Sequence, residues 1–278
     1  MFNIVDLVTP FDFENNIDYE SLLKIIKTIL ESKVDGIVIL GNGSEVFSLN
    51  EEEVVELLNF VLSFVDNRVK VYVGLSGNVN EVLEFDKINK NRKIEGYILK
   101  NVLGNDTGII KYFTHLADNL SFPIMIEDKG EYNLDLIQKA SYHPNIIGIV
   151  VNTNEYLRLI EIANLVKNRC DILITNHCLI LPSINLGLKG IITVSGNGFS
   201  DVLSEICQTE NISDKRDIYF NYKQLFEAIE EEMDPIGIKY FMKLKGICED
   251  KVRLPLGDCS KVLKRKIEEH YYNLQIIK

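Results

Sequence analysis

The sequence predicts an α/β protein, a (β/α)8 barrel of the TIM type with a C-terminal extension of three helices. Eight short apolar runs, rich in β-branched residues, alternate with segments that have helical apolar spacing, which is the pattern of parallel strands joined by crossover helices. After about residue 210 the strands stop, and three helical segments follow without a low-complexity linker. We therefore expect a barrel over residues 1–210 and a helical extension over residues 211–278 that packs on it. An open doubly wound sheet is the alternative.

Each expected strand is a short apolar run bounded by polar, Gly or Pro residues. Pro10 follows the first run and Pro123 precedes the fifth, and proline is typical of such limits. The expected strands are Ile4–Thr9, Gly36–Leu40, Lys70–Gly74, Gly96–Leu99, Ile124–Glu127, Ile146–Val151, Asp171–Thr175 and Gly190–Val194.

Several expected helices begin at a recognisable cap. Asp18 precedes the first, and Asn50 precedes the second with Glu53 three residues later, which is typical of a helix start. Pro235 suits a first helical turn after the cap Asp234. The barrel helices are expected at Tyr19–Ser32, from Glu51 onward, and at Val79–Asn89, Ile109–Asn119, Leu134–Ala140, Glu155–Lys167, Ile180–Leu186 and Phe199–Cys207. The extension helices are expected at Asp214–Met233, Pro235–Lys245 and Ser260–Leu274.

The stretch Lys33–Glu53 combines a strand, a tight loop and a capped helix. Its loop, Gly41–Glu45, leaves the carboxyl end of a strand, where α/β folds bind ligands. Backbone N–H groups of such a Gly-rich loop can hold an anion. The alternative is a turn that merely requires glycine.

Composition excludes several classes of function. The chain has 278 residues, a formal charge of −11 and 46% hydrophobic residues, so we expect a large core and no binding to nucleic acid. No apolar run is long enough for a membrane helix, and the N-terminal residues show no export signal. The cysteines are widely spaced and odd in number: Cys170, Cys178, Cys207, Cys248 and Cys259. We therefore expect reduced thiols and a cytoplasmic protein without membrane contact.

A set of short sequence pieces occurs in a fixed order along the chain: Leu7–Phe11, Gly36–Glu45, Leu49–Glu53, Phe122–Ile126, Pro144–Ile149, Leu181–Pro182, Gly187–Val194, Asp234–Lys239 and Val252–Leu256. In their order and spacing these pieces resemble the dihydrodipicolinate synthase / N-acetylneuraminate lyase family. The resemblance implies a barrel with a three-helix extension, a homo-oligomer (dimer or tetramer), and class I aldolase chemistry on pyruvate or another 2-oxo acid.

Class I aldolase chemistry needs a lysine amine that forms a Schiff base with the oxo acid. The resemblance places this lysine at the end of the sixth strand, where the sequence has Val150. The family's proton-shuttling tyrosine falls on Glu127, and its paired loop threonines fall on Asn42 and Gly43. The family's P-Y-Y segment falls on residues 100–104, from Lys100 through Asn101 to Gly104. The catalytic groups of the family are thus replaced together.

The remaining polar residues at strand ends are the candidate site. Glu127, Lys100 and Lys129 are the catalytic candidates, because a displaced lysine in an apolar pocket becomes a nucleophile. The ligand-binding candidates are Gly41, Asn42, Gly43, Ser44, Glu45, Asn152, His177 and Ser195. Glu45, Glu127, Asp128 and His177 suit a divalent cation, an acid/base pair or a solvated rim, and no metal-ligand spacing favours the first. We assign no metal and no cofactor.

Two hypotheses follow. The first is a divergent paralogue that binds a small metabolite, with a 2-oxo acid as one candidate, or a related subunit, without class I aldolase turnover. The alternative is an active lyase on a 2-oxo acid with an altered mechanism, using Lys100, Lys129 or the acidic rim with a metal.

Overall fold

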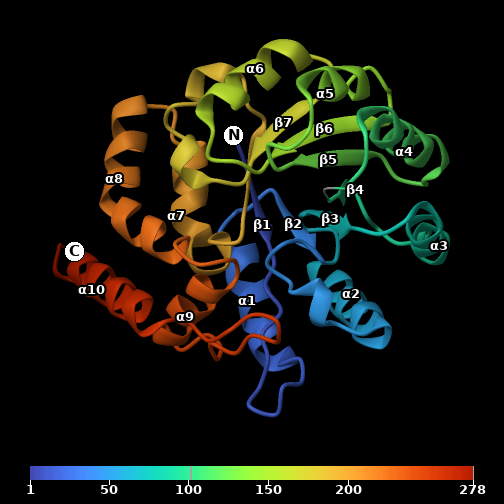
Figure 1. Cartoon of the computed structure of the whole chain (residues 1–278). Helices are drawn as coiled ribbons and strands as arrows, with labels where there is room; N and C mark the ends of the chain where they lie inside the picture. Colours follow the sequence, from blue (N-terminus) through green and yellow to red (C-terminus); the bar gives the residue numbers. More distant parts are fainter. Residues whose placement is uncertain (101, 278) are drawn as a thin grey trace. The chain divides into compact units, whose positions relative to one another are not determined.

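Eight parallel strands form a closed barrel, in chain order, in the computed structural model, which describes residues 1–100 and 102–277 (Figure 1). The strands are β1 (Phe2–Asp6), β2 (Gly36–Ile39), β3 (Lys70–Leu75), β4 (Gly96–Leu99), β5 (Ile124–Asp128), β6 (Ile146–Val151), β7 (Asp171–Ile174) and β8 (Gly190–Thr193). The predicted (β/α)8 barrel is confirmed, and the open sheet is excluded. Of the segment predicted at residues 100–104, Asn101 lies outside the described residues.

The helices follow the predicted order with a few differences. They are α1 (Tyr19–Glu31), α2 (Glu51–Val65), α3 (Val79–Asn89), α4 (Asp106–Asn119), α5 (Leu134–Ala140), α6 (Tyr156–Val166), α7 (Gly196–Gln208), α8 (Ile212–Ile229), α9 (Ile236–Leu244) and α10 (Lys261–Ile277). The predicted caps Asp18 and Asn50 are confirmed, since each side chain accepts a hydrogen bond from its helix's first turn.

Two local predictions are wrong. The predicted helix Ile180–Leu186 is replaced by two short 3-10 turns, His177–Leu179 and Ile184–Leu186, because Pro182 cannot donate a backbone hydrogen bond to a continuing helix. The predicted cap Asp234 is also displaced, since Pro235 is the N-cap of α9 and makes no side-chain cap.

The contacts divide the chain into two compact units. The central unit comprises residues 70–192, and the terminal unit comprises residues 2–69 together with 193–278. Each unit is described separately below. The predicted boundary at residue 210 stays a prediction, because the terminal unit joins the first two βα units to the C-terminal helices.

Aromatic packing holds the C-terminal helices in the terminal unit, where α7 to α10 lie side by side (Figure 1). The ring of Phe199 on α7 stacks on Phe241 of α9 at 4.4 Å and meets Phe226 of α8 edge-on at 5.0 Å. Gly198 permits this approach, since a Cβ there would lie 2.9 Å from the Phe241 ring. Burial of three aromatic rings explains why the extension packs without a linker.

Strands β5, β6 and β7 lie side by side in the central unit, with α4, α5 and α6 outside them (Figure 1). β6 is buried along almost its whole length, as is typical of a parallel strand covered on both faces.

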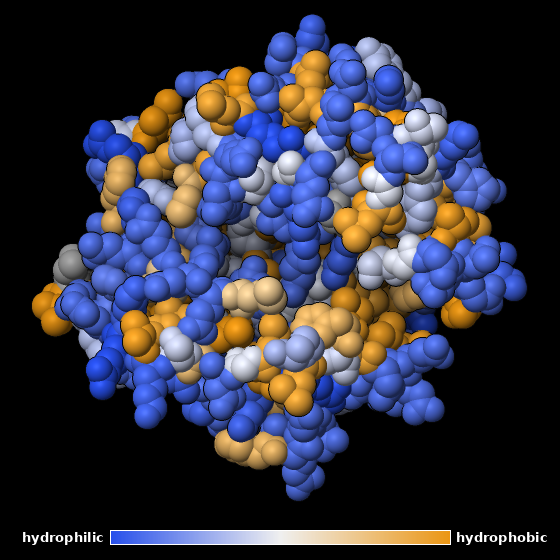
Figure 2. Space-filling view, viewed as in Figure 1, coloured by the Kyte–Doolittle hydropathy of each residue, from blue (hydrophilic) through white to orange (hydrophobic). Residues whose placement is uncertain are grey.

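At the surface, hydrophilic side chains cover much of the face seen in Figure 2, with hydrophobic side chains scattered among them. None of the helices in the described part of the chain is both long and apolar enough to cross a membrane.

Candidate functional site

The carboxyl ends of β5 and β6 bring Glu127 and Val150 together on one face of the sheet. The two residues are register partners, and in-register residues of parallel strands point the same way. Their neighbours Asp128 and Val151 form the next pair and point to the opposite face. Asp128 contacts Arg158 on the outer helix α6, so Glu127 and Val150 face the barrel interior. Both are 2% exposed.

A chain of hydrogen bonds holds the Glu127 carboxylate in place. Asn152 donates from Nδ2 to Glu127 Oε1 at 2.7 Å, and Thr175 donates from Oγ1 to Asn152 Oδ1 at 2.8 Å. Lys129 places Nζ 3.9 Å from Glu127 Oε2, and its side chain is 42% exposed. This arrangement joins two predicted catalytic residues and one predicted ligand-binding residue. Thr175 is an addition that the sequence did not single out.

Asp128 is separate from this group, although the sequence grouped the two carboxylates. Arg158 donates from Nε and from a terminal nitrogen to the two Asp128 oxygens, each at 2.8 Å. The same guanidinium donates to the Tyr132 carbonyl at 2.5 Å, and the Gly130 N–H donates to Asp128 at 3.2 Å. A fully buried carboxylate with a bidentate arginine partner is a structural ion pair that fixes the loop after β5 to α6.

We expect Arg158→Met to lower the free energy of unfolding by about 3 kcal/mol, because it leaves the buried Asp128 carboxylate uncompensated. Urea unfolding followed by circular dichroism measures this loss. Lys189→Met is the matched control: its exposed pair with Asp171 at 3.6 Å is worth less than about 1 kcal/mol. Equal losses in the two variants would show that the Asp128 pair is not structural.

The other predicted residues of the central unit occupy different surroundings. Lys100 follows β4, and its backbone N–H donates to Leu75. Tyr132 accepts a hydrogen bond from the Val102 N–H at 2.8 Å, and burial raises the pKa of the Tyr132 hydroxyl to about 12. His177 begins a 3-10 turn and is fully buried.

In the terminal unit the loop 41–45 binds a carboxylate of the protein itself. The Asn42 N–H donates to Asp6 Oδ2 at 2.8 Å, and the Gly43 N–H makes a longer contact of 3.4 Å with Oδ1. Asp6 ends β1 and is 4% exposed. These are the N–H groups that the sequence predicted as an anion site. Binding of an external anion to this loop stays a prediction, and it would require the Asp6 carboxylate to move.

Glu45, the last residue of this loop, belongs to a buried charge network. Lys239 donates to Glu45 Oε1 at 2.5 Å and to the Lys251 carbonyl at 2.8 Å, and both side chains of the pair are fully buried. The Arg253 N–H donates to Glu45 Oε2 at 2.8 Å. Burial lowers the pKa of the Lys239 amine, while the Glu45 carboxylate opposes that effect.

Arg253 extends this network to α2 and to the loop before α1. Its guanidinium makes two hydrogen bonds to the Glu53 carboxylate, at 2.6 and 2.8 Å, and lies 4.2 Å from the centre of the Phe11 ring. The arginine hydrogen bonds make the pKa of Glu53 lower than usual. Five of the pieces on which the family resemblance rests therefore meet in one cluster: Leu7–Phe11, Gly36–Glu45, Leu49–Glu53, Asp234–Lys239 and Val252–Leu256. We interpret that cluster as structural.

Ser195, the predicted ligand-binding residue after β8, is the N-cap of α7. It is 2% exposed and makes no side-chain cap bond. Asn197, two residues later, makes the hydrogen bonds at this end of the helix. Its Nδ2 donates to the Asp6 and Val194 carbonyls at 2.7 and 2.8 Å, and its Oδ1 accepts from the Val8 N–H. These bonds tie β1 to the start of α7.

The sequence contained a signal for two of the structural residues that it did not single out, Asp6 and Lys239. Asp6 is a charge inside the apolar run FNIVDLV, and Lys239 is a charge inside the apolar helix IGIKYFM. A charged residue in an otherwise apolar buried segment indicates a partner, because burying an unpaired charge is costly. The partner cannot be found from spacing, since Glu45 and Lys239 are 194 residues apart.

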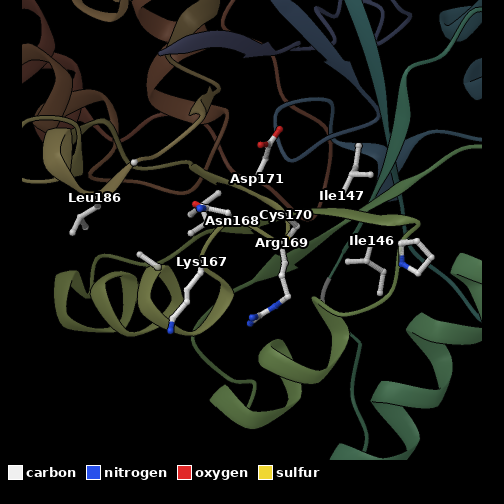
Figure 3. Close-up of a pocket in the computed structure, with 12 residues that line it drawn as sticks. Ile146, Ile147, Lys167, Asn168, Arg169, Cys170, Asp171 and Leu186 are labelled. Carbon is white, nitrogen blue, oxygen red and sulfur yellow. The ribbon is translucent and has the colours of Figure 1, made fainter.

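A polar cavity of about 440 Å³ lies elsewhere in the central unit, at the amino ends of β6 and β7 (Figure 3). Segment 167–172 lines it, together with Ile146 and Ile147. The Asp171 carboxylate points away from the side to which the Lys167 amine and the Arg169 guanidinium extend (Figure 3). Because this cavity lies at the amino ends of the strands, it is distinct from the predicted site, whose residues follow the carboxyl ends of the strands. Across residues 1–100 and 102–277, no group of three or more His, Cys, Asp or Glu side chains could hold a metal ion.

The fold and the site define a (β/α)8 barrel protein with polar residues at the carboxyl ends of its strands. A sequence model described as the dihydrodipicolinate synthetase family matches residues 3–272. The 4-hydroxy-tetrahydrodipicolinate synthase of Clostridium tetani is 27% identical over 96% of each chain, and that of Karelsulcia muelleri is 29% identical over 97% of this chain and 96% of the relative. The crystal structure of dihydrodipicolinate synthase from Aquifex aeolicus matches with a TM-score of 0.90 and 27% identity, over 98% of each chain. The chain belongs to the dihydrodipicolinate synthetase family.

Proposed function

We propose that this protein is a family member that binds a small metabolite without class I aldolase turnover. The observation that carries the proposal is the register pair Glu127–Val150 at the carboxyl ends of β5 and β6. The family resemblance places the Schiff-base lysine at Val150 and the proton-shuttling tyrosine at Glu127. Valine has no nucleophilic atom, and a buried carboxylate replaces the phenol beside it.

The lysine of the Glu45 network does not replace the missing amine. The Lys239 amine is fully buried and donates to both Glu45 and the Lys251 carbonyl. An amine that attacks a carbonyl must be neutral and accessible to the substrate. Burial alone lowers the pKa of this amine, but its position inside an ion pair makes it a structural residue.

The polar chain Thr175–Asn152–Glu127 indicates which ligands would bind. Glu127 Oε1 accepts a hydrogen bond from Asn152, and the Lys129 amine lies 3.9 Å from Oε2. A buried carboxylate favours ligands that offer N–H or O–H donors or a positive charge. We therefore expect a small polar metabolite with a hydroxyl, amide or amino group.

The alternative function is a lyase that acts on a 2-oxo acid through a displaced lysine. One observation favours it: Lys129 carries its amine to within 3.9 Å of the Glu127 carboxylate. An amine there would lie beside the position at which the resemblance places the Schiff base. The side chain is nearly half exposed, and a desolvated pocket is what activates a lysine.

Borohydride trapping distinguishes the two functions. We expect no covalent adduct when the pure protein is incubated with pyruvate, reduced with borohydride and weighed intact by mass spectrometry. The Aquifex aeolicus relative, treated in parallel, is the positive control. An adduct that disappears in Lys129→Ala but persists in Lys167→Ala would overturn the proposal in favour of the displaced lysine.

The relatives are named as 4-hydroxy-tetrahydrodipicolinate synthases, and we propose that this chain does not share their reaction. A homo-oligomer and a cytoplasmic location stay predictions. In each unit, exposed apolar side chains such as Leu103 and Leu254 are compatible with contacts between subunits.

A further inference from the structure

We propose that the Asp6 carboxylate is an internal ligand of loop 41–45. It occupies a site that fits a small monocarboxylate, and the loop binds an external one only when this carboxylate is removed. The inference goes beyond the proposed function and rests on contacts within the terminal unit.

The contacts of Asp6 are those of a bound anion. Asn42 donates its backbone N–H to Oδ2 at 2.8 Å, and Gly43 directs its N–H to Oδ1 at 3.4 Å. Successive backbone N–H groups that converge on one anion form the type of concavity that binds phosphates and carboxylates. Because Asp6 is almost completely buried, its carboxylate interacts with these N–H groups in the near absence of water.

The shape of the loop accommodates the carboxylate through Gly41. A Cβ at position 41 would lie 2.1 Å from Asp6 Oδ1 and 2.5 Å from both Cγ and Oδ2. These distances are far below any van der Waals contact, so the carboxylate occupies the volume that a side chain at position 41 would need. The site and its occupant are therefore matched in size as well as in charge.

The loop also has its own supports, which do not involve the Asp6 carboxylate. Ser44 donates from Oγ to the Gly41 carbonyl, and Thr9 donates from Oγ1 to the Ser44 carbonyl, each at 2.9 Å. Glu45 is held by Lys239 and by the Arg253 N–H. We therefore expect the N–H groups to keep their direction when the carboxylate is deleted, which leaves an anion site already organised for binding.

Two deletions of different size test the inference by chemical rescue. Asp6→Ala removes a group of the size of formate, and Asp6→Gly removes one of the size of acetate. We expect formate to raise the midpoint of thermal unfolding of Asp6→Ala by about 3 °C over sodium chloride of equal ionic strength, and acetate to do the same for Asp6→Gly. Formate should bind Asp6→Ala at least tenfold more tightly than it binds the unmodified protein.

The amide signals of Asn42 and Gly43 report directly on the site. In ¹H–¹⁵N spectra we expect both signals to move in Asp6→Ala and to return toward their original positions when formate is added. Equal effects of formate on Asp6→Ala and the unmodified protein, or amide signals that ignore formate, would overturn the proposal.

Asp6→Asn keeps the shape of the side chain and serves if the smaller variants do not fold. Its neutral amide oxygen is a weaker acceptor than a carboxylate, so the Asn42 amide signal should move, and formate should have no effect because the site remains filled. An unchanged Asn42 signal in Asp6→Asn would also overturn the inference. A trapped pyruvate adduct would instead overturn the proposed function and leave the Asp6 contacts unaffected.

Discussion

Lys239→Met is expected to lower the free energy of unfolding by about 3–5 kcal/mol, because it leaves the Glu45 carboxylate buried without its counter-charge. The pair is fully buried, so water cannot replace the lost ammonium group. The Lys251 carbonyl loses its donor at the same time. Urea unfolding monitored by circular dichroism measures the loss as a shift of the midpoint at constant slope.

The double variant Glu45→Gln, Lys239→Met is the control for this prediction. Removing both charges removes the penalty of an isolated one, so it should recover more than half of the loss. The amide side chain introduced at position 45 can still accept from the Arg253 N–H, which limits the structural change. A double variant as unstable as Lys239→Met would show that the pair is not the cause.

Gly41→Ala is expected to be the second large effect, a loss of about 3 kcal/mol, because the added methyl group would lie 2.1 Å from Asp6 Oδ1. One of the two groups must move, and the carboxylate would lose its bonds to the Asn42 and Gly43 amides. Thermal and urea unfolding of the variant measure the loss. Gly257→Ala is the matched control, since no heavy atom lies within 4 Å of a Cβ there, and it should change stability by less than about 0.5 kcal/mol.

The same substitution in the Asp6→Ala background should be much less costly. Without the carboxylate, the three atoms nearest to the added methyl group are gone. The double variant should therefore be about 2 kcal/mol more stable than the sum of the two single losses predicts. Additive losses would mean that Gly41 is required by the backbone rather than by the Asp6 carboxylate. The cycle therefore tests the packing argument independently of any added anion.

The barrel, the order of its strands and the capped starts of α1 and α2 follow from the amino-acid sequence without knowledge of the fold. The spacing of apolar residues and the cap residues at helix ends are local properties of the sequence. The run IIGIVV can be buried as a strand, and Asn50 with Glu53 caps a helix, whatever the rest of the chain does. The prediction of a helix at Ile180–Leu186 was wrong for a local reason as well. The apolar spacing suits a helix, but Pro182 has no backbone N–H to continue one.

The role of each polar residue depends instead on contacts across the fold. Glu127 and Asp128 are neighbours in the chain, yet strand alternation points one to the barrel interior and the other to Arg158 on α6. The loop predicted to hold an anion holds Asp6, which lies 36 residues earlier. Such assignments require knowing which side chains meet in three dimensions, because a charge is stabilised by its partners in space rather than by its neighbours in sequence.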